Sequence, residues 1–297
     1  MFGNSVPVNP PTQKRGRGRP KGSKNKDKTD VVLNRELLHI RGMITALFDL
    51  IAGALSPTHL VPDGHFGHNA ALQMARQKGL QLVSKLRYDS ALYLPYQGPI
   101  RNRKYGKKLN PRKMPEQFLC ERTNDKGMQT EIYQAKVRHK EFAQLLNVVI
   151  LVKTNLKTNA QAHVILFTSD LALSYQSVID YYSLRFQIEF NFRDAKQFWG
   201  LEDFMNTTET AVTNAVNLSF FMVNLSYRLL QDCRQDNSEF SILDLKACFR
   251  GYKYVEEVLK LLPQKPDPIS LAQIFAKVSN LGAVHPTLPR VAAMRLF

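Results

Sequence analysis

The chain has 297 residues, a net charge of +16 and a pI near 9.8, and 44% of its residues are hydrophobic. That length is enough to bury a sizeable core in one large domain or two small ones, and the positive excess indicates a polyanionic partner, most commonly nucleic acid. The three cysteines, Cys120, Cys233 and Cys248, have neither the pattern of a disulfide framework nor zinc-site spacing, which suits a reducing cytoplasm.

Residues 1–30 are predicted to be a basic disordered tail, since Pro, Gly, Lys and Arg dominate them and little there can form a core. Residues 14–28 alone hold eight basic residues and one acid. Arg15, Arg17 and Arg19 alternate with glycine in a pattern similar to an AT-hook, whose thin backbone lets arginines enter the minor groove of A·T tracts. A nonspecific basic linker has the same composition, and the sequence leaves both interpretations open.

Residues 31–90 are typical of the first part of an α/β core. Apolar residues at helical spacing are followed by short apolar runs and by the breaker Ser56-Pro57. The predicted elements are a helix over 34–53, a strand over 58–62 that ends at Asp63, a helix over 69–79 that Asn69 caps, and a strand over 80–86.

Residues 91–167 change character and are predicted to be a β-rich insertion. Tyr133, Ala135 and Val137 alternate with polar residues, which is the period of a strand with one buried face. Continuous apolar runs at 146–152 and 163–167 predict two further strands. The segment 101–113 holds seven basic residues and no acid, and we interpret it as a loop that runs along DNA.

Residues 168–205 contain the segment with the most specific pattern. Tyr182, Arg185, Glu189 and Lys196 follow the spacing Y-x2-R-x3-E-x6-K. On one helix at about 100° per residue, these positions fall within an arc of roughly 60°. One carboxylate is thus flanked by cations and a phenol hydroxyl, an arrangement that can hold a divalent metal with phosphates on either side.

A solvated helix face with ordinary ion pairs is the alternative, since Arg185 and Glu189 stand four residues apart. Against it, Phe186, Phe190 and Phe192 crowd the same helix and favour a charged strip that faces a cleft. From average residue usage, the spacing is expected by chance in only about one chain of this length in a thousand.

Residues 206–297 are predicted to be a helical region, with helices over about 208–230, 242–262 and 269–279. The apolar run 216–230 is interrupted by Asn217, Asn224 and Arg228, which favours a buried helix over a membrane span. No membrane is therefore expected among the partners.

The 182–196 motif resembles the Y-R-E-K signature of bacterial DDE transposases of the insertion-sequence-four group, which have a ribonuclease-H-like catalytic fold. Residues 60–67 resemble the strand end that bears the second acid of that family, and 84–87 and 167–174 resemble its flanking segments. The similarity extends from about residue 15 to about residue 230. It implies an α/β, ribonuclease-H-like core with a β insertion, in which 168–205 is the catalytic helix segment.

Transposases of this class use three carboxylates and two Mg²⁺ or Mn²⁺ ions for phosphoryl transfer on DNA. The resemblance makes Asp63 and Glu189 catalytic residues and metal ligands, and makes Tyr182, Arg185 and Lys196 contacts to DNA phosphates. From local sequence alone, a turn aspartate is the favoured interpretation of Asp63. We predict that His65 and His68 are surface residues and that Asp170 is a cap or turn residue.

The first acid of the family has no counterpart here. In that fold it lies on the first of three strands that precede the first helix, whereas a basic linker precedes the helix predicted at 34–53. Asp27 and Asp30 belong to the lysine-rich tail, and Asp49 lies inside the predicted helix. The sequence therefore predicts an N-terminally incomplete catalytic domain.

These observations leave different kinds of function open. The first is a DDE transposase that cleaves and joins insertion-sequence ends, in a shortened form that is inactive alone. The second is a catalytically dead DNA-binding derivative that acts as an inhibitor, and a remnant that does not fold is the third. The implied partners are transposon ends, target DNA and a second copy or full-length transposase, in the nucleoid of a bacterial cytoplasm.

Overall fold

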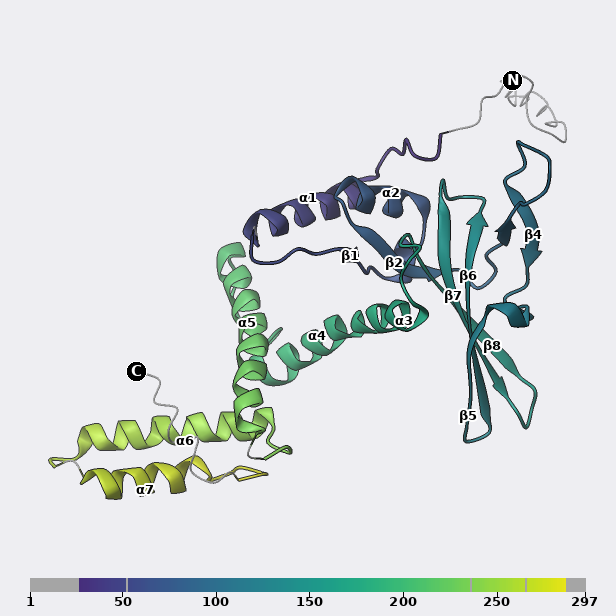
Figure 1. Cartoon of the computed structure of the whole chain (residues 1–297). Coiled ribbons are helices and arrows are strands. Elements are labelled where there is room, and N and C mark those ends of the chain that lie inside the picture. Colours follow the sequence, from purple (N-terminus) through teal and green to yellow (C-terminus); the bar gives the residue numbers. More distant parts are fainter. Residues whose placement is uncertain (1–26, 52, 236, 265, 287–297) are drawn as a thin grey trace, which may run out of the picture. The chain divides into compact units, whose positions relative to one another are not determined.

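The computed structural model describes residues 27–51, 53–235, 237–264 and 266–286 (Figure 1). The chain divides into two compact units, which we call unit 1, ending at Tyr182, and unit 2, beginning at Ser183. The AT-hook-like residues Arg15, Arg17 and Arg19 lie outside the described residues.

Unit 1 is a mixed α/β body built on one sheet. Its strands are β1 (His59–Leu60), β2 (Gln81–Leu86), β3 (Leu92–Pro95), β4 (Tyr105–Leu109), β5 (Leu119–Asp125), β6 (Met128–His139), β7 (Leu145–Asn155) and β8 (Gln161–Thr168). Its helices are α1 (Arg35–Leu50), α2 (Asn69–Gln77) and α3 (Tyr175–Leu184), with 3₁₀ turns η1 (Gly64–Phe66) and η2 (Glu116–Phe118).

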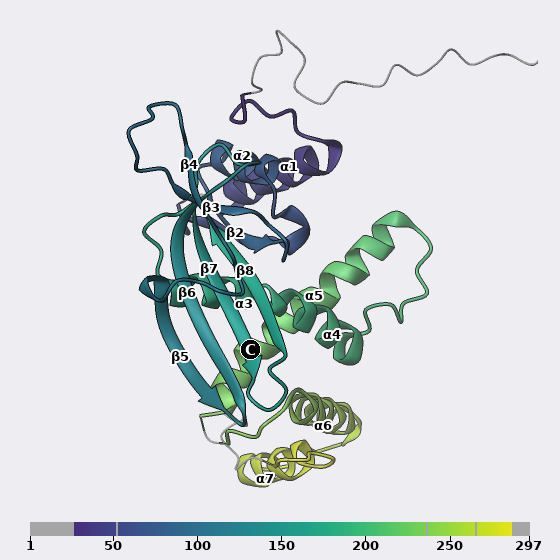
Figure 2. The ribbon, with the colours of Figure 1, turned by 90° about the vertical axis from the view of Figure 1, so that its right-hand side faces the viewer.

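The strand order is β1-β2-β8-β7-β6-β3-β4, and β5 pairs with β6 (Figure 2). Among the described residues, β1 and β2 are parallel and the other paired strands are antiparallel. This mostly antiparallel sheet, followed by C-terminal helices, confirms the predicted fold class and is consistent with a ribonuclease-H-like domain.

Successive residues of β2 face opposite sides of the sheet, and each side has its own core. Leu82 and Leu86 belong to the core that includes residues of α1 and α2. Val83 packs on the other side, with Val178 of α3. Figure 1 shows α1 and α2 over one face of this sheet and α3 over the other. Burial on both faces explains why β7 and β8 are continuously apolar where they pass between the helices.

The strands within 91–167 extend the same sheet, where the sequence predicted an insertion. β8 pairs directly with β2, so that Ser84 lies opposite Phe167. The predicted alternation in β6 is confirmed, because Tyr133, Ala135 and Val137 are all buried. The interpretation of 101–113 as a loop is wrong in its middle part, where β4 pairs with β3. Its sequence gave no such signal, since Gly106 and two lysines are unfavourable in strands.

The caps of the first two helices are Asn34 and His68, whereas the sequence predicted Asn69 as the cap of the second. Asn34 caps α1, since its side-chain oxygen accepts a hydrogen bond from the Leu37 N–H at 2.8 Å. Asn69 does not cap α2, because it is already the first helical residue. Instead, His68 Nδ1 accepts from the Ala71 N–H at 3.3 Å. A cap stands one position before the first helical residue, and in α2 that position belongs to His68.

Unit 2 is helical in the described residues. It comprises α4 (Phe186–Trp199), α5 (Glu209–Cys233), α6 (Ile242–Leu261) and α7 (Pro268–Ser279), close to the predicted helices. α5 is amphipathic where a buried helix was predicted, since Leu218 and Phe221 are 61% and 58% exposed. No helix in the described part of the chain is long and apolar enough to cross a membrane.

A substitution at Gly67 tests how tightly the loop after Asp63 packs on β2. A Cβ on Gly67 would lie 2.0 Å from the backbone oxygen of Lys85. We predict that Gly67→Ala lowers the free energy of unfolding by about 1–3 kcal/mol, as overpacking does. Gly42→Ala in α1 is the control, since no atom beyond its chain neighbours and the backbone of its own helix lies within 4 Å of the added Cβ, and alanine favours a helix. Equal thermal stability of the two variants would contradict the packing described for this loop.

Candidate functional site

Asp63 stands at the carboxyl end of the parallel pair β1–β2. The Ser84 hydroxyl of β2 donates a hydrogen bond to the Asp63 carbonyl oxygen at 3.1 Å. The same carbonyl accepts from the Phe66 N–H at 2.9 Å as η1 begins. Asp63 itself is exposed. The acid therefore follows a strand end, as the sequence predicted, on a backbone that two hydrogen bonds hold in place.

Lys85 and Tyr182 lie beside Gly64, the residue that follows Asp63. A Cβ built on Gly64 would lie 3.4 Å from Lys85 Cβ and 3.7 Å from the Tyr182 hydroxyl oxygen. Lys85 follows Ser84 along β2, and Tyr182 belongs to the core on the α3 side of the sheet. The Lys85 side chain and the Tyr182 hydroxyl thus lie beside the residue that follows Asp63.

Sequence reasoning did not single out Lys85 as a site residue. The signal was a lysine inside the apolar strand Gln81–Leu86, next to the strand end that carries Asp63. An exposed lysine in a strand that is otherwise largely buried indicates that this part of the sheet surface faces a polar partner or solvent.

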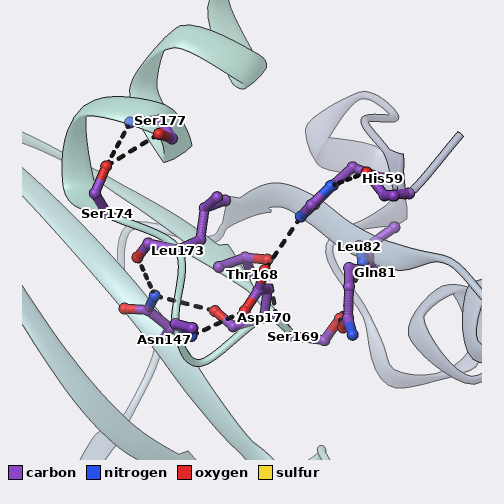
Figure 3. A network of polar contacts seen from close by, with 12 residues as sticks. His59, Gln81, Leu82, Asn147, Thr168, Ser169, Asp170, Leu173, Ser174 and Ser177 are labelled. Carbon is purple, nitrogen blue, oxygen red and sulfur yellow. Dashed lines mark hydrogen bonds and ion pairs between the residues drawn. The ribbon is translucent and has the colours of Figure 1, made fainter.

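A polar network centred on Asp170 fixes the neighbouring strands (Figure 3). Its Oδ2 lies 3.4 Å from His59 Nε2 of β1, and its Oδ1 accepts from the Ala172 N–H at 2.8 Å. The Asn147 amide of β7 donates to the carbonyl oxygens of Asp170 and Leu173, at 3.1 and 2.8 Å. Asp170 is therefore a turn residue, one of the two roles predicted for it.

Ser169 completes the link between β8 and β2. Its hydroxyl donates to Gln81 Oε1 at 2.6 Å and accepts from the Leu82 N–H at 3.0 Å (Figure 3). On the other side, the His59 ring makes an edge contact with the Tyr181 ring, with centroids 5.2 Å apart. Since Tyr181 precedes Tyr182 on α3, the network also holds the helix that carries the motif tyrosine.

The spacing predicted that the motif lies on one helix, and this prediction is wrong. α3 ends at Leu184 and α4 begins at Phe186, with Arg185 between them. There the Ile188 N–H bonds to the Arg185 carbonyl at 3.2 Å, which is a tighter three-residue turn. The division between the units also falls here, after Tyr182. Neither Gly nor Pro occurs in 175–199, so the sequence carried no break signal.

α4 is oriented within unit 2 by a buried acid. The Asp194 side chain is 3% exposed and accepts a hydrogen bond from the Tyr227 hydroxyl of α5 at 2.6 Å. That hydrogen bond, together with burial, raises the pKa of Tyr227. On a helix with about 100° per residue, the side opposite Asp194 carries Arg185, Glu189 and Lys196, each within about 40° of that direction. The charged strip therefore points away from α5.

The strip is not enclosed by aromatic residues within unit 2. Phe186, Phe190 and Phe192 are each more than two-fifths exposed. The side chain of Glu189 is 59% exposed and pairs with Arg185, Nη1 to Oε1 at 3.2 Å. Lys196 Nζ lies 2.7 Å from Glu202 Oε1. The structure therefore contains the i,i+4 ion pair between Arg185 and Glu189, and both cations of the motif have carboxylate partners.

A complete metal site is not present in the described residues, where no group of three His, Cys, Asp or Glu side chains could hold an ion. His65 is an exposed side chain 3.8 Å from Glu36, as predicted for a surface histidine. Asp49 lies inside α1, as predicted. Asp63 offers the hard carboxylate oxygens that Mg²⁺ prefers.

Comparison with protein families adds an independent finding. A family described as DDE superfamily endonuclease matches residues 2–143. This part of the chain is similar to a transposase-type nuclease domain. The match includes Asp63 and the strands from β1 to β6, and it ends before Tyr182 and Glu189. No curated protein sequence matches the chain. Endonucleases of this superfamily generally use divalent metals and act on DNA.

Proposed function

We propose that this chain is a DDE transposase of the insertion-sequence-four group, which acts on DNA at insertion-sequence ends. The observation that carries the proposal is the strand end at Asp63, where Tyr182 and Lys85 lie beside Gly64, the residue that follows the acid. The family match over 2–143 supports the acid's assignment, because it includes this strand end. The Y-R-E-K spacing supports the narrower placement within the insertion-sequence-four group.

In this proposal the residues of unit 1 receive the DNA backbone. The Tyr182 hydroxyl donates a hydrogen bond to a phosphate oxygen, and Lys85 balances the negative charge of that phosphate. The exposure of Asp63 leaves its carboxylate accessible to the same phosphate through a bound cation. A divalent ion, when bound, would supply the charge that stabilises phosphoryl transfer.

Glu189 is the second proposed ligand for Mg²⁺ or Mn²⁺, with Arg185 and Lys196 as phosphate contacts. At present Arg185 pairs with Glu189 and Lys196 pairs with Glu202. Both side chains of the Lys196–Glu202 pair are exposed, and such pairs contribute little to stability, so a phosphate can replace the Glu202 carboxylate at low cost. The arginines of the N-terminal tail would add affinity without reading much sequence.

Metal-directed cleavage of the polypeptide tests whether Asp63 and Glu189 hold the same ion. Fe²⁺ that replaces Mg²⁺ produces hydroxyl radicals with ascorbate and peroxide, and these cut the chain close to the ion. We predict two cuts, one near residue 63 and one near residue 189, both suppressed by excess Mg²⁺. Glu189→Gln should remove both cuts, because the amide keeps the shape and loses the charge. A cut near only one of these residues would contradict a shared ion.

The purified chain is expected to bind duplex DNA without nicking a supercoiled plasmid in Mg²⁺ or Mn²⁺. Two carboxylates hold a pair of metal ions poorly, and three are used in this class. Binding is measured by fluorescence anisotropy and nicking by gel electrophoresis. Metal-dependent nicking that Glu189→Gln abolishes would show that the catalytic site of this chain is complete.

A DNA-binding derivative that does not cut DNA is the second candidate. The weak support under Asp63 favours this candidate. β1 pairs with β2 at only two positions and lies at the edge of the described sheet. Such a protein would occupy transposon ends or pair with a full-length transposase, and so inhibit transposition. Adding the chain to an active transposase reaction tests this candidate, which predicts that fewer transposon ends are cleaved as more chain is added. Unchanged cleavage would contradict it.

A further inference from the structure

A second basic site lies in unit 1, where the chain leaves β2 and β4. Its cavity has a volume of about 460 Å³. The residues that matter for its chemistry are Tyr88, Asp89, Lys108, Asn110, Arg112 and His163, contributed by the segments after β2 and around the end of β4 and by β8. None of them belongs to the Asp63 strand end or to the Y-R-E-K motif.

The cavity is positively charged. Lys108 and Arg112 line it, and among the described residues neither side chain has a carboxylate partner. Asp89 is the acid in the lining, and Arg87 already neutralises it, with Nε to Oδ1 at 3.2 Å. Two uncompensated cations in one concave surface favour an anionic ligand.

The cavity also offers an aromatic face. Tyr88 lines the cavity and is 67% exposed, so its ring is accessible to a ligand there. His163 holds the Tyr88 backbone in place, since its Nε2 lies 2.8 Å from the Tyr88 carbonyl oxygen. A carbonyl only accepts, so Nε2 carries the proton and Nδ1 of the neutral ring is left as an acceptor.

The neighbouring hairpin continues this combination of cations and rings. The Arg103 guanidinium lies 4.6 Å from the centre of the Tyr96 ring, and Lys140 Nζ lies 5.4 Å from the centre of the Tyr93 ring. Tyr93 and Tyr105, on β3 and β4, are in edge contact. Alternating cations and aromatic rings are the means by which proteins follow a single strand of nucleic acid.

We propose that this cavity receives one unpaired nucleotide of a DNA strand, a proposal that rests on the proposed DNA-binding function. Lys108 and Arg112 bind its phosphate, the base stacks on Tyr88, and His163 Nδ1 accepts a hydrogen bond from the base. A stacked ring needs an exposed base face, which a base inside a duplex does not offer. A phosphate alone would leave the Tyr88 ring without a role.

The test compares DNA duplexes that differ only at one end. One is blunt, one carries a short single-stranded overhang, and one carries an overhang of the same length with abasic sites. The variants are Tyr88→Ala, Tyr88→Phe, Lys108→Gln and Arg112→Gln. Lys157→Gln is the charge control, since Lys157 is exposed at the turn between β7 and β8. Affinity is measured by fluorescence anisotropy at several salt concentrations.

We expect Tyr88→Ala to weaken binding of the overhang about five- to a hundred-fold, the range of a lost stacking contact, and to leave blunt DNA unchanged. Tyr88→Phe should keep the affinity, which also shows that the fold tolerates substitution there. Lys108→Gln and Arg112→Gln should each lower the log–log salt slope for the overhang by about 0.7. The abasic overhang should bind the native chain as weakly as the base-bearing overhang binds Tyr88→Ala.

Two results would overturn the inference while leaving the proposed function intact. One is DNA binding in which Tyr88→Ala behaves like Lys157→Gln. The other is an abasic overhang that binds as well as the base-bearing one, which would reduce the site to a phosphate contact. If the native chain binds none of the three DNAs, the proposed function itself fails, and this inference with it.

Discussion

The parallel pairing of β1 with β2 is the constraint on which the position of Asp63 depends. The ladder consists of two residue pairs, His59 with Gln81 and Leu60 with Leu82. So short a strand is held mainly by side chains at its ends. Asp170 holds the His59 side, and Ser84 holds the Asp63 side. The acid is thus placed by a few polar contacts beside β2, a strand that is largely buried.

Charge in this chain is divided between paired and unpaired cations. In the Y-R-E-K motif, Arg185 and Lys196 already have carboxylate partners. At the end of β4, Lys108 and Arg112 have none within the described residues. Unpaired cations supply affinity and long-range attraction for a polyanion, whereas cations that must exchange a partner supply a contact that forms only when a phosphate is positioned. The unpaired cations are therefore suited to attracting DNA, and the paired cations of the motif to positioning a phosphate.

The sequence predicted most of this fold because long apolar patterns leave few alternatives. The helices at 34–53, 208–230, 242–262 and 269–279 and the alternation at Tyr133 correspond to helices and a strand in the structure. What failed was local. The break at Arg185 has no Gly or Pro to mark it, and β4 is a strand only because β3 pairs with it. A tertiary contact decides β4, and sequence spacing does not report such contacts.

The candidate site was predictable to a similar extent. The end of a short strand placed Asp63 correctly, since a strand end and a turn are local features. Lys85 was missed because its importance comes from Tyr182, a residue far along the chain that α3 brings to the same strand end. The i,i+4 geometry of Arg185 and Glu189 was also predictable, because it depends on one turn of one helix.

Site-specific photo-crosslinking tests most directly the central claim that DNA passes the strand end at Asp63. A benzoylphenylalanine replaces Tyr182, whose hydroxyl lies beside Gly64, and in a control it replaces Tyr175 at the other end of α3, where the hydroxyl donates to Glu121 at 3.1 Å. The two positions share a helix and a residue type, so that only their location differs. We predict a covalent DNA adduct from position 182 and none from position 175. Adducts of equal yield at both positions, or an adduct from 175 alone, would contradict the assignment of this strand end as the DNA-binding site.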